Sequence, residues 1–192
     1  MRLIRSRLGL LAGSVAMAVG CASLAGCGGT PAGASTPQLG AAAKGKDCIH
    51  LHFFENTTAY YRGNSATGVG AVGSYHDRLW ASSAFAKQIG AGMGTFAVTS
   101  QDSVSGDLIE YSTEQDQFAG GSFVISDYFD RTLMLAGHWV GGTDGAGMYV
   151  KGTSGRYLGM TGKVVWRILS LTKTGVPTEL KYVLCGKRRA SG

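Results

Sequence analysis

The stretch Tyr149–Trp166, YVKGTSGRYLGMTGKVVW, constrains the fold of this chain more than any other. Glycines recur in it at positions 152, 155, 159 and 162, with apolar or aromatic residues between and after them. Glycine reaches positive φ without steric cost, so Gly-Thr-Ser-Gly after a short apolar run indicates a strand that ends in a tight turn. Two strands joined by a loop with glycines at set places predict a fixed corner of a β-structure.

Strand patterns separated by glycine-rich turns fill most of the chain. In CIHLHFFEN, Ile49, Leu51 and Phe53 alternate with less apolar positions, which is the period of a strand. Further strands are expected at residues 94–99, 107–113, 122–129, 132–140, 148–151, 163–171 and 178–185. About eight strands with this spacing are typical of an antiparallel meander. We therefore predict an all-β fold, an eight-stranded antiparallel closed β-barrel, wide enough for side chains or one small ligand.

The chain has a net charge of +6, but this positive charge comes from residues outside the expected barrel. Between Cys48 and Cys185 there are 10 Lys and Arg against 11 Asp and Glu, a net charge of −1. A nucleic-acid-binding module concentrates basic residues on its folded part, so no nucleic-acid partner is expected. No His/Cys cluster has metal-ligand spacing and no glycine motif has the context of a nucleotide fold, so we expect no metal and no cofactor.

The N-terminal segment is predicted to be a bacterial lipoprotein signal peptide, residues 1–26. Three arginines precede the apolar run Leu8–Val19, which is too short for a stable transmembrane helix. The sequence Leu24-Ala25-Gly26-Cys27 then resembles a lipobox, which implies lipidation of Cys27 and anchoring to the extracytoplasmic face of the bacterial cell membrane. The alternative is an ordinary secreted protein in which the cysteine is incidental.

Composition also sets the remaining boundaries of the chain. Residues 27–46 are rich in Gly, Ala, Ser, Thr and Pro and are expected to be a flexible tether, followed by the barrel domain at 47–186 and a basic disordered tail at 187–192. Cys48 opens the first expected strand and Cys185 closes the last. A disulfide between them would join the two ends of the barrel. The alternative is two free buried thiols.

A family resemblance rests on the segment 121–166. A strand beginning GSFVISDYF, then YVKGTSGRYLG and Gly162, resembles the signature of allene oxide cyclase-like and dirigent-like proteins, with Met160 in place of the usual alanine. The segment Leu51–Glu55 is similar to the opening strand of these families. The resemblance implies a barrel with an apolar cavity, often a homotrimer, that binds a small apolar molecule and steers its cyclisation or coupling by confinement. If the protein is an enzyme, an isomerase or cyclase is expected.

Three residues are candidates for catalysis. Glu55 and Asp127 share the parity of the apolar positions on their strands, and His138 lies on an expected long strand. A carboxylate on an apolar face has a raised pKa and can act as acid or base. The alternative for each carboxylate is a strand end that reaches water, and for the histidine a packed or rim position. Cavity-wall candidates are Phe53, Tyr128, Trp139 and Tyr149.

Two other functions fit the same expected architecture. One is a non-catalytic structural or interaction barrel that is filled by its own side chains. The other is a lipocalin-like carrier, although the Gly-x-Trp signature near the first strand is absent. The volume of the cavity discriminates between them, because a barrel without room for more than one or two waters can be neither a cyclase nor a carrier.

Overall fold

The computed structural model describes residues 47–62 and 68–186. The predicted signal peptide, the tether, the lipidation site Cys27 and the basic tail lie outside these residues. In the described part, no helix is long and apolar enough to span a membrane.

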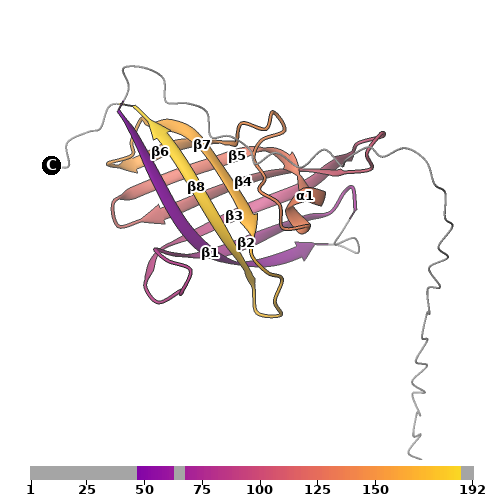
Figure 1. Ribbon diagram of the computed structural model, residues 1–192, viewed down its shortest axis with the longest axis horizontal. Coiled ribbons are helices and arrows are strands. Elements are labelled where there is room, and N and C mark those ends of the chain that lie inside the picture. The colour runs from indigo at the N-terminus through magenta and orange to yellow at the C-terminus, as the bar shows by residue number, and fades with distance from the viewer. Residues whose placement is uncertain (1–46, 63–67, 187–192) are drawn as a thin grey trace, which may run out of the picture. The chain divides into compact units, whose positions relative to one another are not determined.

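Eight antiparallel strands form a closed barrel in the described part of the chain (Figure 1). Each strand pairs with the next in sequence, and the last pairs with the first. The fold class expected from the sequence is therefore confirmed. The strands are β1 (Cys48–Arg62), β2 (Val72–Trp80), β3 (Gln88–Gln101), β4 (Leu108–Phe118), β5 (Gly121–Asp130), β6 (Met148–Gly155), β7 (Thr161–Ile168) and β8 (Val176–Cys185).

The expected strand at 132–140 is wrong. This segment holds the helix α1 (Arg131–Leu135) and part of the loop that leads to β6. The side chain of Asp130 accepts a hydrogen bond of 2.9 Å from the backbone N–H of Leu133, which caps the helix, and leucine and methionine favour the helical backbone. The eighth strand is instead β2, where the buried positions Gly73 and Asp77 interrupt a period-two pattern of apolar residues.

The disulfide predicted between Cys48 and Cys185 is confirmed. The two residues are direct partners in the register of β1 and β8, with their Cα atoms 4.1 Å apart. The bridge joins residues 137 positions apart in the sequence, at the seam where the barrel closes.

One end of the barrel is filled by side chains. The glycine-rich corner between β6 and β7 lies there and contributes Tyr157 and Met160, which are almost completely buried. Tyr157 packs edge-on against Phe123, with their ring centroids 4.5 Å apart. Gly152 has no side chain because a Cβ would overlap the backbone carbonyl of Tyr157. The glycines thus have a structural role: they allow the short loop between β6 and β7 to fold back and close this end of the barrel.

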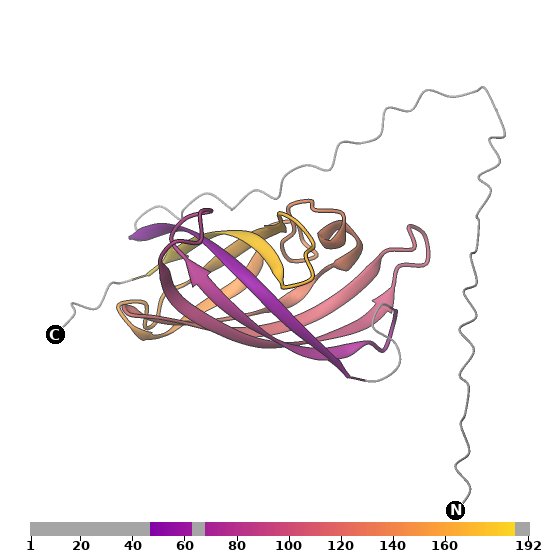
Figure 2. The ribbon, with the colours of Figure 1, turned by 90° about the horizontal axis from the view of Figure 1, so that it is seen from below.

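The opposite end of the barrel carries longer connections. The links at 102–107, 131–147 and 169–175 all lie at this end (Figures 1 and 2). Val140 forms an antiparallel bridge with Trp166, which continues the wall beyond the start of β6. The interior is hollow near this end, and the candidate site lies there.

Candidate functional site

A cavity opens inside the barrel toward α1 and the long connections. The cavity has a volume of about 150 Å³. One water needs roughly 10–15 Å³, so the space can hold a small organic molecule. The barrel is therefore only partly filled by its own side chains.

The wall of the cavity is divided into an apolar and a polar side. Strands β5 to β8 supply the apolar side, which includes Ile125, Phe129, Met148, Val164, Trp166 and Leu180. Strands β1, β2 and β4 supply the polar side, which includes Glu55, Tyr75, Glu110, Ser112 and Glu114. A bound molecule would thus rest an apolar face on one side and present polar atoms to the other.

Strand β3 makes room for the polar side. Gly92 pairs with Asp77 of β2 and with Asp116 of β4, so the two acidic side chains flank a position without a side chain. A Cβ on Gly92 would lie 2.5 Å from Oδ1 of Asp116 and 3.0 Å from Oε1 of Glu114. The glycine lets carboxylates from both neighbouring strands lean over β3 into the interior.

Four carboxylates gather beneath the cavity as a result, from three strands: Glu55, Asp77, Glu114 and Asp116. We call them the acidic floor. One carboxylate oxygen from each of Glu55, Asp77 and Glu114 lies within 4.8 Å of the other two. Asp116 accepts a hydrogen bond of 3.0 Å from the hydroxyl of Tyr182. Among the described residues, buried Oε2 of Glu55 has no hydrogen-bond partner.

Burial raises the pKa of every carboxyl group in the acidic floor. The pKa of Glu55 and that of Glu114 are raised well above their ordinary values, first by burial and then by the charges of neighbouring acids. Burial raises the pKa of Asp77 to about 7, with Asp116 adding to the shift and nearby Thr57 and Glu114 opposing it. The neutral form of these carboxyl groups is therefore favoured, and a neutral carboxyl group can donate a hydrogen bond.

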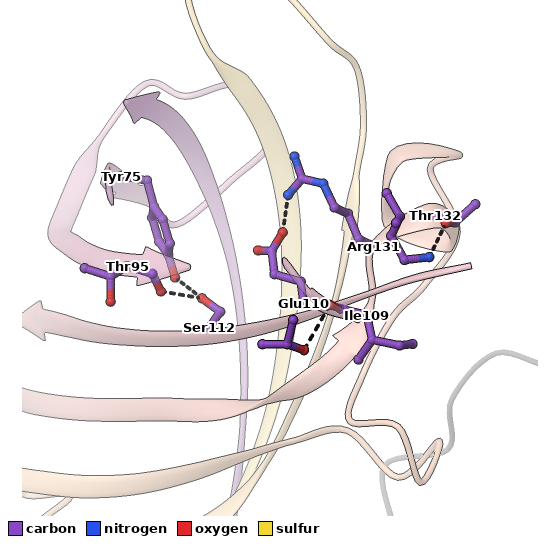
Figure 3. A network of polar contacts seen from close by, with 9 residues as sticks. Tyr75, Thr95, Ile109, Glu110, Ser112, Arg131 and Thr132 are labelled. Atoms are coloured by element: carbon purple, nitrogen blue, oxygen red, sulfur yellow. Dashed lines mark hydrogen bonds and ion pairs between the residues drawn. The ribbon is translucent and has the colours of Figure 1, made fainter. Parts of the chain in front are cut away.

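Tyr75 and Ser112 form a second polar group above the floor. Their hydroxyls are 2.7 Å apart, and the Ser112 hydroxyl also lies 3.3 Å from the backbone carbonyl of Thr95 (Figure 3). The Tyr75 hydroxyl also lies 3.4 Å from Oε2 of Glu114. Burial raises the pKa of Tyr75 well above its ordinary value, so its hydroxyl stays protonated and can donate.

A buried ion pair forms part of the cavity wall beside this group. Arg131, the first residue of α1, donates a hydrogen bond to Oε2 of Glu110 (Figure 3). The guanidinium carbon of Arg131 also lies 5.5 Å from the ring centroid of Phe96. Burial raises the pKa of Glu110, and the positive charge of Arg131 opposes this shift. The pair ties α1 to β4 and places the helix beside the cavity.

Of the three candidate catalytic residues, the structure places Glu55 on the cavity. Asp127 has the parity of the inner face but is turned to the backbone: its carboxylate accepts hydrogen bonds from the N–H groups of Tyr128 and Tyr149, at 2.8 and 3.2 Å. It thus supports the start of β6. His138 follows α1 in the loop and is exposed. Neither residue lines the cavity.

The expected wall residues lie elsewhere. Tyr128 and Tyr149 are 46% and 42% exposed, because their positions alternate with the inward residues of β5 and β6. Trp139 lies in the loop after α1, beneath the side chains of Arg167 and Lys181. Phe53 does point inward but packs against Phe118 and Tyr182 in the filled part of the barrel.

Sequence reasoning missed most of the polar side of the cavity. On β4 the inward residues Glu110, Ser112, Glu114 and Asp116 are all polar. The strand therefore has no apolar face that would mark its orientation. The available signal was GAGMG at 90–94, where glycines alternate with larger residues and leave one face of β3 without side chains.

The fold and the site together define a class of protein: a closed eight-stranded antiparallel barrel with a divided cavity. The family model of the allene oxide cyclase barrel-like domain matches residues 54–176. The chain therefore belongs to the allene oxide cyclase barrel-like family. No curated protein matches it in sequence.

Solved structures with the same fold include cyclases and dirigent proteins. A nonspecific heme-binding cyclase that catalyses a (4 + 2) cycloaddition is 22% identical, with a TM-score of 0.59 over 75% of this chain and 66% of that one. This chain thus spans just under two thirds of that cyclase. An exo-specific intermolecular Diels–Alderase is 24% identical, with a TM-score of 0.60 over 73% of this chain and 99% of that one. A pterocarpan synthase dirigent protein is 14% identical, with a TM-score of 0.53 over 74% and 97%.

Proposed function

We propose that the protein binds a small, largely apolar molecule in the barrel cavity and steers its cyclisation or coupling. The observation that carries the proposal is the divided cavity, in which an apolar wall faces buried carboxyl groups and hydroxyls. The similarity to barrel cyclases and a dirigent protein supports the fold on which this depends.

Confinement supplies the first part of the proposed mechanism. A flexible chain held against Phe129, Trp166 and Leu180 loses its extended conformers and keeps those in which its reacting ends are close. Such positioning can contribute several kcal/mol to lowering a barrier, on the order of 7–11 kcal/mol in the best intramolecular cases. No covalent bond to the protein is required.

The polar side of the cavity supplies the second part. Glu55 and Glu114 are buried carboxyl groups whose raised pKa favours the neutral form, so either can donate a hydrogen bond to a carbonyl oxygen that gains negative charge. The Tyr75 hydroxyl is the other donor beside them. In this proposal Asp127 and His138 have no chemical role.

The lipocalin-like carrier is the alternative that the cavity also favours. Its volume is large enough for a ligand, and the polar groups could serve recognition alone. A barrel that works only through its outer face does not account for the site, because such a barrel has no need of buried carboxylates beneath a cavity. Removal of a carboxyl group would abolish turnover in an enzyme, whereas a carrier has no turnover to lose.

A ligand screen by native mass spectrometry, followed by Glu55→Gln and Glu114→Gln, tests the proposal. An enzyme loses turnover of the identified compound in these variants and still binds it, whereas a carrier shows no turnover in either form. Failure of every small apolar compound to bind would contradict both functions. The same spectra report whether the protein is a homotrimer, as in many members of this family.

We further propose that the barrel is anchored by lipid at Cys27 to the extracytoplasmic face of the cell membrane. The lipobox-like sequence supports this, and the Cys48–Cys185 disulfide is consistent with an oxidising compartment. Intact-mass analysis of the membrane fraction should show a diacylglyceryl adduct on Cys27. Cleavage at another position without an adduct would refute the anchor.

A further inference from the structure

Among the described residues, no Lys or Arg forms a salt bridge with the acidic floor. Arg131 is the only Lys or Arg among the residues that line the cavity, and it is paired with Glu110. The ion pairs of the described residues include none of the four carboxylates of the floor. Buried carboxylates are normally paired, hydrogen-bonded or protonated, because an isolated buried charge is very costly. When the carboxyl groups of the floor ionise, no Lys or Arg of the described residues neutralises their negative charge by a salt bridge.

A second observation points from the floor toward the cavity. Glu55 is only 6% exposed, its Oε2 atom has no hydrogen-bond partner among the described residues, and the residue lines the cavity beside Glu114. Asp77 and Asp116 are also buried and stand behind these two. A group that enters the cavity therefore meets Glu55 and Glu114 first and is surrounded by the field of all four carboxylates.

From this geometry we infer that the molecule bound in the cavity carries a basic amine, whose ammonium group rests on the acidic floor while its apolar body packs against Phe129 and Trp166. This inference rests on the proposed function and names the chemical class of its ligand. An ammonium group has three donors and no acceptor, which suits a site built from carboxylate oxygens. Carboxylate oxygens within 4.8 Å of one another can accept hydrogen bonds from the same nitrogen.

When an amine binds, its ammonium group replaces a proton that the acidic floor held before. Without a ligand, the floor holds protons, because burial and mutual repulsion favour the neutral carboxyl groups. When an ammonium enters, it takes the place of a proton, which passes to the solvent. The titratable groups that face this position are Glu55 on β1, Tyr75 and Asp77 on β2, Glu114 and Asp116 on β4, and Tyr182 on β8.

The pH dependence has a definite sign. Raising the pH removes protons from the floor while an alkylamine stays charged, so the affinity for the amine should rise. The increase is at most about tenfold per pH unit for one proton released. A neutral molecule of the same shape releases no proton, so its affinity should not rise with pH.

Three matched probes test the inference on the full chain: naphthylmethylamine, naphthylmethanol and naphthoate. Their affinities are measured by isothermal titration calorimetry at pH 6 and pH 8. We expect the amine to bind at least tenfold more tightly than the alcohol at pH 8, and the naphthoate to bind most weakly. The double variant Glu55→Gln/Glu114→Gln should bind amine and alcohol equally. Glu179→Gln, the same substitution at an acid that pairs with His52 and Arg167 outside the cavity, should keep the preference.

The outcomes separate this inference from the proposed function. Equal binding of amine and alcohol in the unmodified protein would overturn the inference and leave a cavity for neutral apolar molecules. Absence of binding by all three probes at millimolar concentration would contradict the inference and the proposed function together. If the double variant fails to fold, as judged by circular dichroism, the single variant Glu114→Gln decides, with a loss of preference of at least threefold expected.

Discussion

Replacement of Asp77 by asparagine should change how the stability of the barrel depends on pH. Asp77 is 3% exposed and lies on the inner face of β2, where it pairs with Gly92 of β3. Its pKa is raised from 3.8 to about 7, mainly by burial. The native state therefore binds this proton more tightly than the unfolded chain does, so the stabilisation is complete below about pH 4 and is lost as the pH rises toward 7.

The magnitude follows from the two pKa values. Each unit of difference corresponds to about 1.4 kcal/mol, so the full effect of Asp77 is about 4 kcal/mol. Between pH 5 and pH 8 the free energy of unfolding should fall by roughly 2–3 kcal/mol through this group alone. For a domain of this size such a change lowers the Tm by roughly 5–10 °C.

Urea unfolding at pH 5 and pH 8, followed by circular dichroism, measures the effect. Asparagine carries no charge at either pH, so the stability of Asp77→Asn relative to the unmodified protein should be roughly 2–3 kcal/mol higher at pH 8 than at pH 5. Asp144→Asn is the control: this exposed acid lies in the loop before β6 and should give no such gain. A difference between Asp77→Asn and the unmodified protein that is the same at pH 5 and pH 8 would refute the claim that the fold holds a proton at Asp77.

Other substitutions test the packing of the barrel and the position of the cavity. Gly92→Ala should destabilise the fold by about 1–3 kcal/mol in urea unfolding, because its Cβ would crowd two buried carboxylate oxygens; an unchanged midpoint would contradict this crowding. Loss of the disulfide in a Cys48→Ser/Cys185→Ser variant should cost about 2–5 kcal/mol, and a thermal midpoint equal to that of the oxidised protein would argue against it. Trp166→Ala should weaken ligand binding at least tenfold, whereas Trp139→Ala should not, since only Trp166 lines the cavity; the reverse order would place the ligand on the outer wall.

Local sequence patterns predicted the barrel well where each strand has one apolar face. The alternation of Ile49, Leu51 and Phe53 identified β1, and the glycine-rich corner identified the turn between β6 and β7. The prediction of a strand at 132–140 was wrong because the apolar residues of this segment do not alternate. Asp130 instead caps a helix that begins just before this segment. Apolar content without a period does not distinguish a short helix from a strand.

The candidate site was harder to predict because it depends on pairing between strands. The alternation of residues on β1 correctly predicted that Glu55 points inward. The same reasoning on β5 could not show that the Asp127 carboxylate accepts hydrogen bonds from backbone N–H groups. Asp77 and Asp116 meet only because the register places both beside Gly92. Such a contact requires the barrel itself, since the three residues are far apart in sequence.

The most direct test of the account is a crystal structure of the protein with the compound that native mass spectrometry identifies as its ligand. We predict density inside the barrel, with a polar atom of the ligand within hydrogen-bond distance of Glu55 or Glu114 and its apolar part against Phe129 and Trp166. A ligand bound to the outer wall, or a cavity closed by rearranged side chains, would contradict the claim that the interior of this barrel is its functional site.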